Sequence, residues 1–241
     1  MKKIATEEVV KRVDFIVDRL SKAIDKEVTL KRSEREALYE EYNQLMESYD
    51  LFDQVFDEDG KKGVRNAAGK ILVPALYKDL SETYTYKRYG FVMPVPACDF
   101  SGKYALVKCD GKGTPLCGFE YDMIKFMFGS CALYKCRKRV GEKYLTGVID
   151  GDGNVLVPCE MDEVYGISNG FATVEKDGKF GVITTRSLYI EPIYDEVEEN
   201  DGLLKACKDG MWGYIGSNGE FVPKDDDERM RNTVLLGLYE C

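Results

Sequence analysis

The sequence lacks histidine, and this absence removes much of the common chemistry of enzymes. None of the 241 residues is His, so no Ser-His or Cys-His nucleophile and no histidine-ligated metal site can form. No CxxC pair, dinucleotide-binding fingerprint or P-loop occurs either. We therefore expect a protein that is not an enzyme and has no catalytic residue, no cofactor and no metal ion.

Long apolar runs and an excess of positive charge are also missing. No stretch approaches the roughly 20 apolar residues that span a bilayer, and acidic residues interrupt the first 20 positions, unlike a signal peptide. The net charge of −9 disfavours nucleic acid and anionic lipid as partners. We expect a soluble cytoplasmic chain with no membrane or nucleic-acid partner, whose eight cysteines are reduced core residues.

Residues 1–51 predict two amphipathic helices. Apolar residues recur at steps of three and four from Glu7 to Ile24, and Ser33–Glu36 reads S-x-x-E, as in a capping box. A second apolar stripe follows at Leu38, Tyr42, Leu45 and Tyr49. We expect a helical hairpin whose stripes pack together or onto the rest of the chain, and the alternative is a homo-oligomer formed through these helices.

Residues 52–241 contain short apolar strands broken by glycine turns, and self-comparison brings out a repeat. A glycine before hydrophobic residues is followed at a nearly fixed distance by proline. The four instances are Gly63 before Pro74 by 11, Gly147 before Pro158 by 11, Gly181 before Pro192 by 11 and Gly213 before Pro223 by 10. A fifth, more degenerate unit has Ala105 in the glycine position. We therefore expect about five antiparallel β repeats.

Acidic segments and tight turns complete each unit. Met161–Val164 and Tyr194–Val197 follow the proline, and another strand comes next. Asp177-Gly178 and Asp209-Gly210 predict type I′ hairpins, which need positive φ at both central residues. Asp150–Asn154 departs from a calcium loop and predicts a turn between strands. Val234–Tyr239 predicts a last apolar strand.

Two units resemble the WG (KWG) repeat. The resemblance rests on Lys179–Ile183, Ile190–Val197 and Asp209–Ile215. It is specific over about 147–223 and extends weakly over 52–241, with the helices outside it. It implies a β-rich repeat array without a shared catalytic residue. We expect a solenoid-like stack, with a β-propeller as the alternative, and we expect Phe180 and Trp212 to pack between repeats rather than to stack on a ligand.

Two surfaces are candidates for binding. The first is an acidic ridge formed if equivalent positions align, and its residues are Asp162, Glu163, Asp195, Glu196, Asp226 and Asp227. The second is a basic and aromatic patch on insertions of two adjacent repeats, where repeat proteins often bind. Its residues are Tyr84, Tyr86, Lys87, Arg88, Tyr89, Arg137, Lys138, Arg139 and Tyr144. The preferred explanation of the acidic set is solvated edges that resist aggregation, and that of the basic and aromatic set is a long solvated hairpin.

The sequence favours a non-catalytic binding or scaffold module that recognises a protein or another macromolecule through its repeat loops. Three alternatives stay open. A carboxylate-dependent glycan hydrolase would need two carboxyl groups in one cleft. An immunity-type protein would use its negative charge against a basic toxin, and a purely structural protein would oligomerise through its helices.

Overall fold

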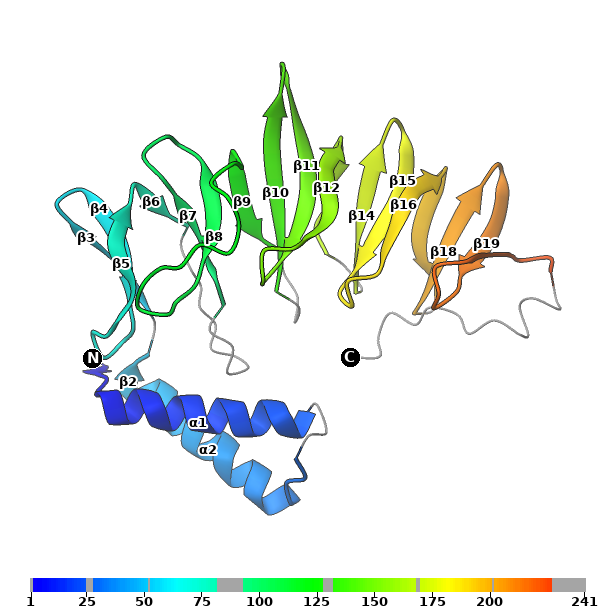
Figure 1. Cartoon of the computed structure of the whole chain (residues 1–241). Coiled ribbons are helices and arrows are strands. Elements are labelled where there is room, and N and C mark those ends of the chain that lie inside the picture. The colour runs from blue at the N-terminus through cyan, green and yellow to red at the C-terminus, as the bar shows by residue number, and fades with distance from the viewer. Residues whose placement is uncertain are drawn as a thin grey trace. The chain divides into compact units, whose positions relative to one another are not determined.

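The chain is mainly β, with two helices near its N-terminus followed by a series of antiparallel sheets (Figure 1). The computed structural model describes residues 2–24, 28–51, 53–81, 93–127, 132–167, 170–200 and 202–226. The chain divides into two compact units, Met1–Phe119 and Glu120–Cys241. Among the described strands each sheet is open, and none closes into a barrel.

The predicted helical pair is confirmed as α1 (Glu7–Ile24) and α2 (Arg32–Ser48). Two short parallel strands, β1 (Lys3–Ile4) and β2 (Tyr49–Asp50), join the segments that flank the pair. The stripe of α1, with Val13 and Ile16 buried, packs against Tyr42 and Leu45 of α2 and against Leu51, Ala67 and Ala68. Neither helix is long and apolar enough to cross a bilayer, as far as the described residues go.

The predicted capping box of α2 is wrong. The helix begins at Arg32, and its N-cap is Lys31, whose side chain makes no capping hydrogen bond. Glu36 pairs instead with Arg32 one turn before it, with 2.8 Å between Nε and Oε1. Ser33 therefore lies inside the first turn, where an i, i+4 ion pair takes the glutamate that the capping box would have used.

Two three-stranded sheets follow in the first unit. The first sheet contains β3 (Gln54–Glu58), β4 (Lys61–Arg65) and β5 (Ile71–Tyr77), and the second contains β6 (Asp79–Leu80), β7 (Val95–Cys98) and β8 (Tyr104–Val107). Val64 and Val73 of the first sheet pack against Leu80, Val95 and Val107 of the second. Each sheet thus buries an apolar face that it could not bury alone.

The described part of the second unit contains three four-stranded sheets. The third sheet contains β9 (Met123–Phe126), β10 (Leu133–Val140), β11 (Lys143–Asp150) and β12 (Val155–Met161). The fourth contains β13 (Glu163–Val164), β14 (Phe171–Lys176), β15 (Lys179–Thr184) and β16 (Tyr189–Tyr194). The fifth contains β17 (Glu196–Asn200), β18 (Leu203–Lys208), β19 (Met211–Ile215) and β20 (Phe221–Pro223).

The fourth sheet packs on both of its faces. Ile183 joins a core with Val148 of the third sheet, whereas its neighbour Val182 joins a core with Leu204 of the fifth. Adjacent residues of a strand point to opposite faces, so one strand serves two cores. The second unit is therefore a stack in which the sheets follow the order of the chain.

The repeated glycine has a steric cause. A Cβ added at Gly181 would lie 2.2 Å from the carbonyl oxygen of Ile190 and 2.7 Å from the nitrogen of Pro192. The ladder between β15 and β16 shifts its register there, and proline suits such a bulge because it has no N–H to leave unpaired. The five predicted repeats are confirmed, since each of the five sheets carries this glycine position.

The second sheet shows why Ala105 is tolerated in place of glycine. Its fourth strand is reduced to one isolated bridge between Val107 and Pro115, so three strands remain. Ala105 itself is fully buried opposite Ala97. An alanine therefore occupies the glycine position in the sheet where the strand that would crowd it is missing.

The predicted hairpin turns are confirmed. Asp177 and Gly178 have φ of 50° and 74°, and Asp209 and Gly210 have 52° and 77°. Asp150–Asn154 joins β11 to β12, and Asp150 accepts the N–H groups of Asp152 and Asn154. The predicted strand at Val234–Tyr239 lies outside the described residues.

The predicted core positions of Phe180 and Trp212 need correction, because both side chains are only half-buried. In β19, Ile215 belongs to the core between the fourth and fifth sheets. Trp212 is three residues away and so points to the opposite face of the strand. There the ammonium of Lys205 lies 4.1 Å from the centroid of the indole ring.

Candidate interaction surface

The β10–β11 hairpin extends beyond its neighbours in the second unit (Figure 1). Both of its strands have eight residues and pair without interruption from Leu133 with Asp150 to Val140 with Lys143, whereas β14 and β15 have six each. At its end the side chains of Val140 and Tyr144 are 57% and 53% exposed. Val140 is not among the predicted binding residues, although an apolar residue beside the turn glycine Gly141 was a visible signal.

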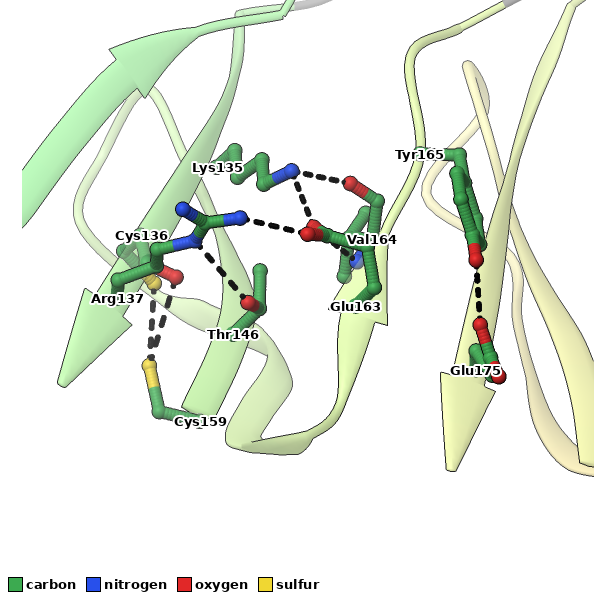
Figure 2. Close-up of polar contacts among 9 residues, drawn as sticks. All are labelled: Lys135, Cys136, Arg137, Thr146, Cys159, Glu163, Val164, Tyr165 and Glu175. Atoms are coloured by element: carbon green, nitrogen blue, oxygen red, sulfur yellow. Dashed lines mark hydrogen bonds and ion pairs between the residues drawn. The ribbon is translucent and has the colours of Figure 1, made fainter. Parts of the chain in front are cut away.

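Three cations alternate along the face of β10 that looks toward the fourth sheet. Leu133 of this face lies in the core shared with that sheet, so Lys135, Arg137 and Arg139 follow it on the same side. Lys135 and Arg137 both pair with Glu163 of β13, and Nη2 of Arg137 lies 2.6 Å from its Oε2 (Figure 2). Only Arg139, the outermost, is exposed.

Glu163 is thus the counter-charge for two cations of the adjacent sheet. Burial acts to raise its pKa, but hydrogen bonds from Lys135 and from the N–H of Val164, with the charges of Lys135 and Arg137, outweigh burial and lower it. Lys135 also donates to the carbonyl oxygen of Val164 at 2.5 Å. These contacts fix the base of the hairpin against the fourth sheet.

The opposite face of the hairpin also contacts neighbouring residues. Nζ of Lys138 lies 2.9 Å from Oε2 of Glu120 and 4.6 Å from the centroid of the Tyr121 ring. At the tip, the Nε of Arg139 donates to the carbonyl oxygen of Gly141 at 3.1 Å. Of the predicted patch, Arg137 and Lys138 therefore serve internal contacts, whereas Arg139 and Tyr144 lie at the exposed end.

The other half of the predicted patch cannot be placed beside it. Its residues are Tyr84, Tyr86, Lys87, Arg88 and Tyr89, and all five lie outside the described residues. Their proximity to the β10–β11 hairpin stays a prediction.

The predicted acidic ridge consists partly of carboxylates that hold turns. Asp162 accepts the N–H of Asp177 at 2.8 Å, and Asp195 accepts the N–H of Gly210 at 3.4 Å. Asp195 also pairs with Lys179, and this hydrogen bond, with that from Gly210, lowers its pKa. Each aspartate thereby binds the strand before it to a neighbouring hairpin turn.

The remaining positions of the ridge differ among themselves. Glu163 is neutralised by two cations. Glu196 is exposed, Asp226 is partly exposed and Asp227 lies outside the described residues. The acidic positions therefore do not form one uniform solvated row, because three of them have partners within the fold.

A hollow of about 600 Å³ lies beside Trp212 on the fifth sheet. The residues that line it are Gly210, Met211, Trp212, Pro223, Lys224, Asp225 and Asp226. An aromatic face, a cation and two carboxylates are the groups that bind sugars or small polar ligands.

Comparison with protein families decides the nature of the repeat. Residues 147–180 match the model of the WG containing repeat. The chain contains a WG repeat. This WG repeat begins at Gly147 on β11 and ends at Phe180 on β15, so it supplies strands to both the third and the fourth sheet. A comparison with curated proteins finds no match.

Proposed function

We propose that this WG-repeat chain is a non-catalytic binding module that recognises another protein through the tip of the β10–β11 hairpin. The observation that carries the proposal is the pair of exposed apolar side chains, Val140 and Tyr144, beside Arg139 and Lys143 at the end of a hairpin longer than its neighbours. Tyr and Arg are enriched where proteins bind each other.

The chemistry of the tip indicates the partner. Internal carboxylates already pair with Lys135, Arg137 and Lys138, whereas Lys143 is exposed. A partner surface with an apolar depression rimmed by carboxylates would complement this tip. The rigid base, held by Glu163, limits the ordering cost of binding.

A non-catalytic role is supported by the sequence and by the use of the acidic residues. The sequence has no histidine, and Asp162 and Asp195 occupy equivalent positions where each binds a turn. Carboxylates that recur at the same position of successive repeats and bind a turn there support a structural role, not a role in one catalytic centre.

A photo-crosslinking amino acid at position 144 tests the proposal directly. The protein is irradiated in native lysate, and the matched control carries the same group at Tyr39 of α2, which is 45% exposed. We expect one protein adduct at 144 that is absent at 39, weakens with rising salt because charge contributes to recognition, and is lost on Arg139→Ser. Equal adducts at both positions, or none at 144, would refute the role of the tip.

The hollow beside Trp212 favours a second candidate, the binding of a glycan or another small polar ligand. Stacking on the indole would place such a ligand next to Asp225 and Asp226, where a carboxylate-dependent hydrolase would also need its acids. Trp212 is the only tryptophan, so ligand binding there would change the intrinsic fluorescence. A panel of oligosaccharides that leaves the emission unchanged would count against this site.

A further inference from the structure

Two cysteine sulfur atoms meet in the third sheet (Figure 2). Cys136 on β10 lies directly opposite Gly147 on β11, and Cys159 belongs to β12. The two Sγ atoms are 3.4 Å apart. They meet although β10 and β12 are separated by β11.

Gly147 makes this contact possible. A Cβ added there would lie 2.9 Å from Sγ of Cys159 and 2.6 Å from the carbonyl oxygen of Val157. The ladder between β11 and β12 also shifts its register around this position. The glycine of the WG repeat therefore leaves the space in which thiols from two non-adjacent strands approach each other.

The two thiols differ in their access to solvent. Cys136 is buried, with 1% of its surface exposed, whereas Cys159 is partly exposed. A hydrogen bond with Cys136 lowers the pKa of Cys159 despite its burial, and Lys138 adds positive charge while Glu120 opposes it. The thiol that solvent can reach is thus one whose pKa is lowered, and the thiolate is the reactive form.

We propose that Cys136 and Cys159 form a modification site at which a hydroperoxide converts the two thiols to an intramolecular disulfide. The thiolate of Cys159 attacks the distal peroxide oxygen, which breaks the O–O bond, gives a sulfenic acid on Cys159 and releases an alcohol or water. The sulfur of Cys136 then attacks the sulfur of Cys159. The S–S bond forms, and the hydroxyl group leaves as water with the proton of Cys136.

The hydroperoxide is the oxidant, and the electrons that it accepts equal those that the thiols lose. Two thiols lose two electrons, and the O–O bond of one hydroperoxide accepts them. The sulfur atoms move from contact to the bonded distance of about 2.05 Å. A dithiol reductant reverses the change by thiol–disulfide exchange.

The experiment uses the full chain under native conditions. The reduced protein is treated with one equivalent of hydrogen peroxide, unfolded, alkylated with N-ethylmaleimide and digested with trypsin. We expect two of the eight thiols to be lost, and the peptide Tyr144–Lys176 to be joined to the dipeptide Cys136-Arg137. Dithiothreitol should restore all eight thiols.

Three serine variants separate the steps. Cys136→Ser should stop at the sulfenic acid of Cys159, which dimedone traps, whereas Cys159→Ser should give neither product. Cys207→Ser removes a buried cysteine of the fifth sheet and should behave as the wild type. The proposal is overturned if the wild-type protein forms no link between positions 136 and 159, or if dimedone labels Cys159 equally in the wild type and in Cys136→Ser. The wild-type peptide map decides the matter even where a variant fails to fold.

Discussion

Replacement of Gly181 by alanine should lower the free energy of unfolding of the second unit more than replacement of any other glycine described in it. The new Cβ would lie 2.2 Å from the carbonyl oxygen of Ile190 and 2.7 Å from backbone atoms of Glu191 and Pro192. A carbon and an oxygen normally approach to about 3.3 Å, so β16 must move away from β15 by about 1 Å. A shift of backbone cannot be relieved by a rotamer change.

The magnitude follows from two costs and one gain. Overpacking costs about 1 to 3 kcal/mol, and each disturbed hydrogen bond of the β15–β16 ladder costs about 1 kcal/mol. Alanine restores about 0.4 to 1 kcal/mol by restricting the unfolded chain. We expect the free energy of unfolding to fall by about 3 kcal/mol. With a slope of about 2 to 3 kcal/mol/M, the urea midpoint should fall by about 1 M or more.

Gly166 provides the matched control. It lies in the same unit, its φ is not in the left-handed region, and a Cβ there would meet nothing within 4 Å. Gly166→Ala should therefore leave the free energy of unfolding unchanged or raise it by about 0.5 kcal/mol. Far-ultraviolet circular dichroism during urea unfolding measures both variants. Equal midpoints for Gly181→Ala and Gly166→Ala would refute the steric explanation of the repeated glycine.

Three further predictions concern charges and the lone tryptophan. Glu163→Gln should lower the free energy of unfolding by about 1 to 2 kcal/mol at pH 7, because two partly buried cations lose their counter-charge. This deficit should shrink as pH falls through the lowered pKa of Glu163, since the wild-type carboxylate is then protonated, and Glu175→Gln is the control in urea unfolding. Asp110 accepts hydrogen bonds from the hydroxyl of Thr114 and from backbone N–H groups. Its carboxyl group should therefore titrate with a pKa of about 2 when followed by NMR. The stability that it contributes is present above its unfolded pKa and is lost as pH falls through about 2. Lys205→Ala should uncover the indole of Trp212, giving a red shift and stronger acrylamide quenching, and an unchanged spectrum would contradict that contact.

The fold was predictable where local sequence carries a steric requirement. The spacing from Gly181 to Pro192 identified two strands because backbone and glycine meet there, and a spacing of 10 or 11 residues occurs in four sheets. Asp177-Gly178 predicted its turn because few other residues adopt positive φ at two successive positions. Such signals depend on the residues in question and their nearest neighbours.

The predictions that failed depended on which of several possible partners a side chain meets. Ser33 and Glu36 had the pattern of a capping box, but Arg32 competes for the same glutamate. The aromatic residue before the repeated glycine was assigned to the core, yet the face of Trp212 depends on strand alternation relative to Ile215. Sequence alone does not say which face of a sheet a neighbouring sheet covers.

The candidate site was predicted only in part for a similar reason. Arg139 and Tyr144 were identified from composition, but Arg137 carries the same charge and is used internally by Glu163. The thiol pair of Cys136 and Cys159 gave no signal, because its members lie on strands that do not pair. One clue was available for the aspartates, since Asp162 and Asp195 each follow a buried residue at the start of a sheet.

The boundaries of the WG repeat do not coincide with the boundaries of a sheet. This offset determines how the array could be lengthened or shortened. A cassette cut at the limits of the matched segment, 147–180, would remove strands from two sheets and leave each with unpaired edges. A cassette cut between sheets, such as 163–194, carries one complete fourth sheet from β13 to β16. Insertion or deletion of repeats in this protein should therefore follow the hydrogen-bonded sheets. The ends of the cassette belong just after the buried residues Met161 and Tyr194, because each is the last residue of its sheet.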